Sequence, residues 1–190
     1  MTDEEDPDEN SLASLFRPPP FESITALMAA DTAATVSDEN FVRHLDWFLG
    51  HVMPYAAADC HGLPEPVVLY WATGLMEYNV FNGGFAQAAY NIPDWFELAA
   101  MGYEQLGRPI AADRVRQAAG LALTERASVS WLKRRRAGIR AIFKHFRGSA
   151  LKALDKDLYE IGWEIAEPRI QLARAHRAVF ASLDERMVQP

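Results

Sequence analysis

Histidine and cysteine are the residues of this sequence best suited to catalysis or metal binding, but their spacing favours neither. His44 and His51 lie seven residues apart, and on a helix this spacing separates them by about 10 Å, too far to share one metal ion. No histidine follows an acidic residue by three positions, as a helical di-iron site requires, and no zinc motif is present. Cys60 and His61 are adjacent, an arrangement that rarely orients a nucleophile against its base. We therefore predict no catalytic residue, no metal site and no cofactor.

A polar segment, residues 77–91, gathers amide and aromatic side chains around a pair of glycines. The fold signature of this turn is Asn82, Gly83, Gly84 and Phe85. Paired glycines supply the left-handed conformation that ends a helix, and neighbouring amides can bond the free backbone groups there. The other hypothesis is that side chains in and after this segment bind a partner. The candidates for partner binding are Glu77, Asn79, Asn82, Gln87, Asn91, Glu97 and Glu104.

A second segment is strongly basic. Its basic residues are Lys133, Arg134, Arg135, Arg136, Arg140, Lys144 and Arg147. On a helix with an apolar stripe these side chains spread over the remaining faces, which favours a solvated basic face that complements the acidic first half of the chain. Contact with phosphate or nucleic acid is the alternative, because clustered arginines bind a phosphate backbone without reading its sequence. No aromatic platform for stacking a single strand is evident.

The net charge of −7 is unevenly distributed. Residues 1–110 hold 17 acidic and 3 basic side chains, whereas residues 111–150 hold 2 acidic and 10 basic side chains. Two copies of such a chain can pair their opposite charges across a two-fold axis, so we expect a homodimer. The single cysteine cannot form an internal disulfide, which favours the cytoplasm. The apolar runs are far shorter than the roughly 20 residues of a membrane span, so no membrane association is expected.

The apolar spacing predicts an all-α protein with one compact domain of about seven to nine helices, residues 21–190, after a flexible acidic tail, residues 1–20. One helix is expected after Ser37, its predicted N-cap, and a central one from Glu65 to the glycine pair. Further helices are expected over residues 23–34, 85–90, 95–106, 110–123, 128–146, 151–166 and 170–183. Pro168 is expected either to open a helix or to kink one.

The run from Asn82 through Gln87 to Asn91 resembles the Asn-Gly-Gly-Phe-x-Gln-x-x-x-Asn signature of a bacterial domain family of unknown general function, which includes a DNA-mimic protein. Weaker matches follow at residues 154–159 and 179–180, and the resemblance extends over about residues 65–182. The resemblance implies an all-α fold and a non-enzymatic role. It also implies an acidic surface that occupies the DNA-binding face of a protein partner.

These observations lead to one main hypothesis and two alternatives. We expect a regulatory protein-binding module of the DNA-mimic type, whose partner is a basic, DNA-binding protein. One alternative is an immunity-type protein that neutralises a toxin. The other is a direct nucleic-acid binder that uses residues 133–147. Enzymatic activity is not expected.

Overall fold

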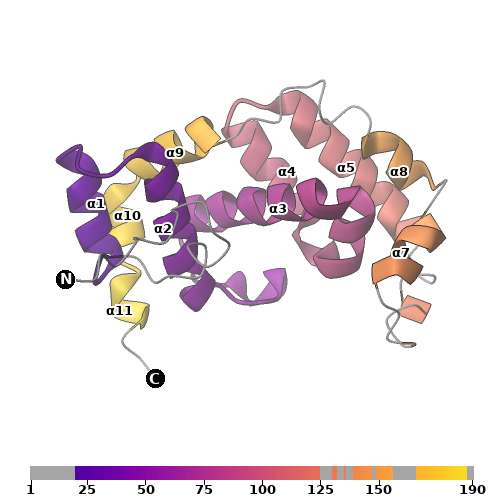
Figure 1. Ribbon diagram of the computed structural model, residues 1–190, viewed down its shortest axis with the longest axis horizontal. Coiled ribbons are helices and arrows are strands. Elements are labelled where there is room, and N and C mark those ends of the chain that lie inside the picture. Colours follow the sequence, from indigo (N-terminus) through magenta and orange to yellow (C-terminus); the bar gives the residue numbers. More distant parts are fainter. Residues whose placement is uncertain are drawn as a thin grey trace, which may run out of the picture. The chain divides into compact units, whose positions relative to one another are not determined.

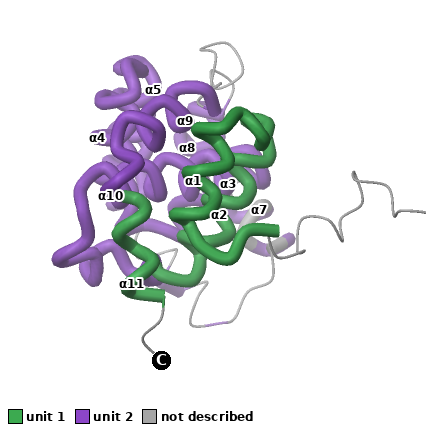
Figure 2. The backbone as a smooth tube through the Cα atoms, turned by 90° about the vertical axis from the view of Figure 1, so that its left-hand side faces the viewer, with its two compact units in different colours: residues 1–52, 180–190 green, residues 53–179 purple. Residues whose placement is uncertain are grey.

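The computed structural model describes residues 20–124, 130–131, 135, 139–146, 149–155 and 166–187. Helices are the regular elements of these residues and no strand occurs among them, which confirms the predicted all-α class. The predicted tail lies outside the described residues except for Pro20. None of the described helices combines the length and the apolar character needed to cross a membrane. The chain clusters into two compact units, residues 1–52 with 180–190 and residues 53–179 (Figure 2).

Unit 1 is formed by segments from the two ends of the chain. It contains α1 (Ile24–Thr32), α2 (Asp38–Val52), α11 (Asp184–Met187) and the last residues of α10 (Arg177–Ala181). Helix α2 contacts both α1 and α11. Its apolar residues recur at spacings of three and four, so that Phe41, Leu45 and Phe48 are buried together on one face.

Side-chain oxygens cap both long helices of unit 1. The hydroxyl of Ser37 accepts a hydrogen bond from the backbone N–H of Asn40 at 3.3 Å, which confirms the predicted cap. The start of α1 is capped by its own Ser23 and also by Asp184, whose carboxylate accepts the N–H groups of Ile24 at 2.8 Å and Thr25 at 2.9 Å. The C-terminal segment thereby fixes the beginning of the first helix.

Unit 2 is built around one long helix, α3. Its elements are η2 (Ala57–Cys60), α3 (Glu65–Asn91), η3 (Pro93–Trp95), α4 (Phe96–Gln105), α5 (Pro109–Thr124), α7 (Ile139–Phe146), α8 (Ala150–Leu154) and α9 (Ala166–Ala175). Helices α4, α5, α7, α8 and α9 all contact α3, and α4 packs most extensively against α5 (Figure 1). The central position predicted for α3 is therefore confirmed within this unit.

Small residues bring the helices of unit 2 close together. Gly102 of α4 faces α3, where an added Cβ would lie 2.6 Å from Cγ2 of Thr73 and 2.9 Å from the carbonyl oxygen of Leu69. The large buried side chains of this core include Phe85 and Tyr103. Close backbone approach and large buried side chains therefore pack α4 tightly against α3.

Two predicted helix boundaries are corrected by the structure. A single helix was predicted over residues 128–146, but Arg135 lies in a turn and α7 begins only at Ile139. Glycine disfavours a helix interior by about 1 kcal/mol, and the range predicted as one helix contains Gly138. The helix predicted over residues 170–183 is instead divided into α9 and α10 by a turn.

Other predicted boundaries agree with the described residues. Pro168 lies in the first turn of α9, where its missing N–H would have no helical acceptor. Helix α4 ends at Gln105, and Gly107 follows with φ of 70°, the left-handed conformation expected of a glycine that terminates a helix. The helix predicted over residues 151–166 falls largely outside the described residues, and α8 is its described beginning.

Candidate functional site

Helix α3 is kinked at the glycine pair, where the sequence predicted that it would end. Gly84 has φ of 75° and ψ of −175°, a backbone conformation that is almost restricted to glycine. A Cβ at this position would also overlap the carboxylate of Asp155, the residue that follows α8. The helix resumes at Phe85, so the predicted helices on either side of the turn are two halves of one kinked element.

Asp155 fills the role of a helix cap at this kink. Its Oδ1 accepts a hydrogen bond from the backbone N–H of Phe85 at 2.9 Å, and its Oδ2 lies 2.7 Å from Nζ of Lys152. A break in a helix leaves the N–H groups that follow it without carbonyl acceptors, and a buried carboxylate supplies one. The fold signature at residues 82–85 therefore joins α3 to α8.

The predicted partner-binding amides divide into buried and exposed side chains. Asn79 is only 3% exposed, and its Oδ1 accepts a hydrogen bond from Nδ2 of Asn91 at 2.8 Å, which ties the two halves of α3 together. Asn82 is exposed and donates to a carbonyl of its own helix. Gln87 is half-buried, and its Oε1 has no hydrogen-bond partner among the described residues. Asn82 and Asn91 are thus the amides of this set that reach the surface.

Glu77, another predicted partner-binding residue, faces the interior of unit 2. Its Oε2 lies 4.0 Å from Nη1 of Arg169, a side chain of α9 that is 4% exposed. The guanidinium carbon of Arg169 lies 4.1 Å from the centroid of the Tyr70 ring, and the absence of a side chain at Gly74 makes room for it. Burial, and then the charge of Glu77, raise the pKa of the nearby Tyr103 well above its usual value.

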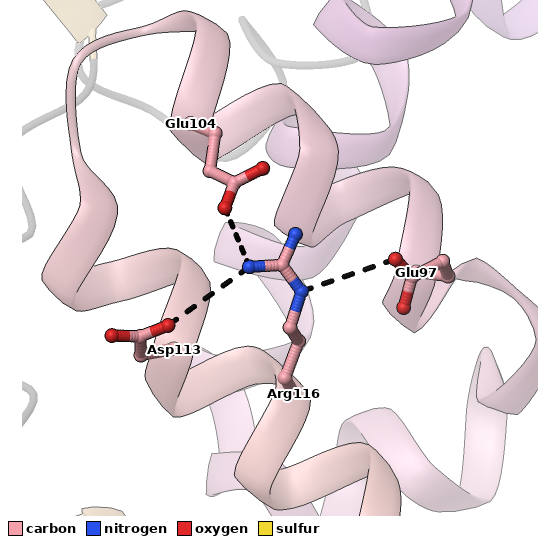
Figure 3. A network of polar contacts seen from close by, with 4 residues as sticks. All are labelled: Glu97, Glu104, Asp113 and Arg116. Carbon is pink, nitrogen blue, oxygen red and sulfur yellow. Dashed lines mark hydrogen bonds and ion pairs between the residues drawn. The ribbon is translucent and has the colours of Figure 1, made fainter.

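Glu97 and Glu104 occupy the surface, where they converge on one arginine (Figure 3). Nη1 of Arg116 lies 2.6 Å from Glu104 and 3.9 Å from Asp113, and its Nε lies 3.9 Å from Glu97. The hydrogen bond from Arg116 lowers the pKa of Glu104. Asp113 and Arg116 were not among the predicted site residues, although their i,i+3 spacing is a signal for an ion pair on a helix.

The exposed charged side chains of residues 53–124, the first part of unit 2, are almost all acidic. Six acidic side chains are exposed between residues 53 and 124, namely Asp59, Glu65, Asp94, Glu97, Glu104 and Asp113. Arg108 is the one exposed basic side chain in the same range, while Arg114 and Arg116 are half-buried. Such a surface attracts cationic groups.

The structure describes only some residues of the predicted basic segment. Arg135, Arg140 and Lys144 are exposed, whereas Lys133, Arg134, Arg136 and Arg147 lie outside the described residues. The guanidinium carbon of Arg135 lies 4.7 Å from the centroid of the exposed Trp131 ring. The ring of Trp131 therefore contacts one of these bases, a contact that was not predicted. The i,i+4 spacing of Trp131 and Arg135 was the available signal.

Cys60 is a half-buried free thiol at the end of η2. Burial, together with the negative charge of Asp59, raises its pKa, which disfavours the nucleophilic thiolate form. In the part of the chain that the structure describes, no three His, Cys, Asp or Glu side chains are grouped so that they could hold a metal ion.

The sequence was also compared with models of known protein families. A family model described as DMP19-like protein matches residues 61–178, which is more than half of the chain and most of unit 2. The matched range includes the kink of α3, Asp155, Arg169 and the carboxylates around Arg116. Neither the curated proteins nor the solved structures that were compared contain a match to the chain.

Proposed function

Because this chain belongs to the DMP19-like protein family, we propose that it is a non-enzymatic regulatory module that resembles a DNA mimic and binds a basic, DNA-binding protein. The proposed binding surface is the exposed face of α4 and α5 that carries Glu97, Glu104 and Asp113. The observation that carries the proposal is the excess of exposed acidic over exposed basic side chains in residues 53–124.

The carboxylates of α4 are held on a helix that packs against α3 and α5, at a spacing that suits this role. Glu97 and Glu104 are seven residues apart on one helix, which places them about 10 Å apart along its axis. One strand of a DNA duplex carries a phosphate about every 3.4 Å along its axis, so this separation corresponds to about three base-pair steps. A rigid helix can therefore present negative charge at intervals that a DNA-binding protein already recognises.

Arg116 reduces the charge of this surface without cancelling it. One guanidinium faces three carboxylates, so the group keeps a net charge of −2. All three carboxylate side chains are about half exposed or more, and solvent or a partner can reach them. Exposed ion pairs contribute little to stability, so a partner's arginine or lysine can take the place of Arg116 at small cost.

The proposal is tested by competition on duplex DNA. Lysate of the source cell is bound to DNA–cellulose, washed, and then eluted with the purified chain. We expect the wild-type chain to elute a DNA-binding protein. The variant Glu97→Gln/Glu104→Gln/Asp113→Asn should elute much less of it, because the carboxylates are needed for binding. The control Glu22→Gln/Glu39→Gln/Glu185→Gln removes three exposed charges from unit 1 and should elute as well as wild type.

Each remaining outcome of this experiment contradicts the proposal. If the wild-type chain elutes nothing, or if both variants elute equal amounts, the carboxylates of α4 and α5 do not form the binding surface. In a separate experiment, capture on the immobilised chain of a protein that has no affinity for DNA would instead favour the immunity-type hypothesis.

The uneven charge also supports a homodimer as part of this proposal. Acidic side chains dominate residues 1–110 and basic ones dominate residues 111–150, so two copies can bring opposite charges together. Sedimentation at micromolar concentration and low salt should give twice the mass of the chain. A monomer under these conditions would rule the dimer out.

A further inference from the structure

An exposed apolar side chain lies among the carboxylates of α4. Met101 is 38% exposed, and it follows Glu97 by four residues and precedes Glu104 by three. These spacings place the three side chains on one face of the helix, within about 60° around its axis. Among the exposed large apolar side chains of the described residues, Met101 alone has an acidic residue three or four positions away on each side. The acidic face of α4 therefore has an apolar centre.

The packing of α4 keeps Met101 at the surface. Its two neighbours in the sequence, Ala100 and Gly102, are both buried, and Gly102 lies against Thr73 of α3. Burying Met101 would require α4 to rotate about its axis, which would expose these two residues. The exposed position of Met101 is therefore determined by the core of unit 2.

Negative charge alone does not account for an apolar side chain at this position. A surface that only attracts cations gains nothing from a thioether between its carboxylates. Methionine is instead enriched at protein–protein interfaces, where its flexible side chain adapts to apolar groups of a partner. Such interfaces combine an apolar centre with a polar or charged rim. The face of α4 thus suits a protein partner that offers an apolar side chain between cations.

The spacing of Glu97, Met101 and Glu104 indicates which element of a partner fits. Helix α4 has ten residues and is thus about 15 Å long, which is nearly three helical turns. On a partner helix that lies along α4, two cations seven residues apart with an apolar residue between them would match these axial distances. Amphipathic helices are commonly bound through side chains at i, i+3 or i+4, and i+7.

From these observations we infer that Met101 packs against an apolar side chain of a basic partner helix, whose flanking cations pair with Glu97 and Glu104. The inference rests on the proposed function, because it takes the acidic face of α4 as the binding surface. The thioether adds a contact that salt does not screen. Met101 thereby discriminates between basic helices that differ in a single apolar residue.

The inference is tested with two synthetic alanine-based peptides of about 18 residues, long enough to form a helix. Both carry arginine at positions i and i+7, and the residue at i+4 is leucine in one peptide and glutamine in the other. Binding at low salt is followed by NMR of the chain labelled with carbon-13 in its methionine methyl groups. The leucine peptide should bind about fivefold to tenfold more tightly. It should shift the signal of Met101, whereas the buried Met28 and Met76 should keep theirs.

Substitutions separate the apolar contact from charge. Met101→Ser should weaken binding of the leucine peptide about fivefold to tenfold and leave the glutamine peptide unaffected, as a double-mutant cycle requires of a direct contact. Met101→Leu keeps an apolar side chain and should retain the preference for the leucine peptide. The control Ile110→Ser removes an exposed apolar side chain from α5 and should change neither affinity. The ratio of the two affinities should stay constant as salt is raised, because charge screening affects both peptides equally.

A charge variant distinguishes failure of this inference from failure of the proposed function. Glu97→Gln/Glu104→Gln should weaken binding of both peptides. If it does so, but wild type binds the two peptides equally or Met101→Ser keeps the preference for leucine, the inference is overturned and the acidic binding surface stands. If neither peptide binds wild type at low salt, or if Glu97→Gln/Glu104→Gln binds both as tightly as wild type, the inference and the proposed binding surface are both contradicted.

Discussion

Two arginines of unit 2 are paired with carboxylates in opposite environments. Arg169 of α9 is buried between the Tyr70 ring, the backbone at Gly74 and the side chain of Glu77. Arg116 of α5 lies at the surface among three carboxylates, with 36% of its side chain exposed. The same ion-pair chemistry therefore appears once inside the helical scaffold and once on the face that we propose for a partner.

Helix α4 connects the two regions through adjacent residues. Tyr103 points inward, where burial and then Glu77 raise its pKa, and Glu104 points outward, where the hydrogen bond from Arg116 lowers its pKa. Removing one member of a buried pair leaves an uncompensated charge in the interior, whereas an exposed pair exchanges its contacts for water. We therefore expect stability to depend on the inner pair, whereas the outer carboxylates remain available for binding.

The largest effect is expected at Arg169. Arg169→Ala should lower the free energy of unfolding by about 3–5 kcal/mol, because it leaves Glu77 without its buried counter-charge and opens a cavity beside Tyr70. Denaturant unfolding followed by circular dichroism measures this loss. The control Arg169→Met/Glu77→Leu replaces both charges with apolar side chains and should be clearly more stable than Arg169→Ala. An unfolding curve of Arg169→Ala identical to that of wild type would contradict the comparison.

The kink of α3 should be the next most sensitive position. Gly84→Ala should cost at least about 1–3 kcal/mol of unfolding free energy, because alanine strongly disfavours this backbone conformation and its Cβ would overlap Asp155. Gly120→Ala is the matched control, since Gly120 lies within α5 with open space around it. That substitution should instead stabilise the protein by about 0.5–1 kcal/mol. Equal effects at the two glycines would show that the kink is not strained.

Alkaline pH should lower the free energy of unfolding through the ionisation of Tyr103. Its pKa is raised in the folded state, so the folded protein keeps this proton after the unfolded chain loses it at about pH 10. The stabilising contribution of protonated Tyr103 is thus fully present below pH 10. Above pH 10 stability should fall by about 1.4 kcal/mol per pH unit, until the folded pKa is reached. Unfolding curves at several alkaline pH values test this, and Tyr103→Phe should remove this part of the pH dependence.

The smallest effect on stability is expected at Arg116. Arg116→Ala should leave the midpoint of denaturant unfolding unchanged within error, because the contacts that it removes are exposed to solvent. The same substitution removes the positive charge from the acidic surface. Binding of a basic partner should therefore become tighter, as titration calorimetry can measure. A large loss of stability would show that Arg116 is needed for folding, as Arg169 is, and would contradict the comparison between the two arginines.

Local features of the fold could be predicted from the sequence. The break at Gly83 and Gly84, the end of α4 before Gly107 and the cap at Ser37 depend on residues within one turn of the chain. Such local preferences are independent of the rest of the molecule. Pro168 was likewise placed correctly at the start of a helix, as one of two predicted outcomes.

Contacts between distant residues could not be predicted in the same way. Asp155 bonds the backbone N–H of Phe85 from 70 positions away, and nothing in the sequence around Glu77 indicates that Arg169 faces it. Glu77 was therefore grouped with surface carboxylates, although burial on one side of α3 turns it inward. Glu97 and Glu104 were identified as surface acids, but their common arginine depends on how α5 packs against α4.

The most direct test of the proposed function measures how salt affects binding of the purified DNA-binding partner to this chain. For the wild-type chain the affinity should fall steeply with salt concentration. For Glu97→Gln/Glu104→Gln/Asp113→Asn the affinity at low salt should be at least about tenfold weaker, a change of about 1.4 kcal/mol, and the salt dependence shallower. Equal affinity and equal salt dependence for the two proteins would contradict a binding surface formed by the carboxylates of α4 and α5.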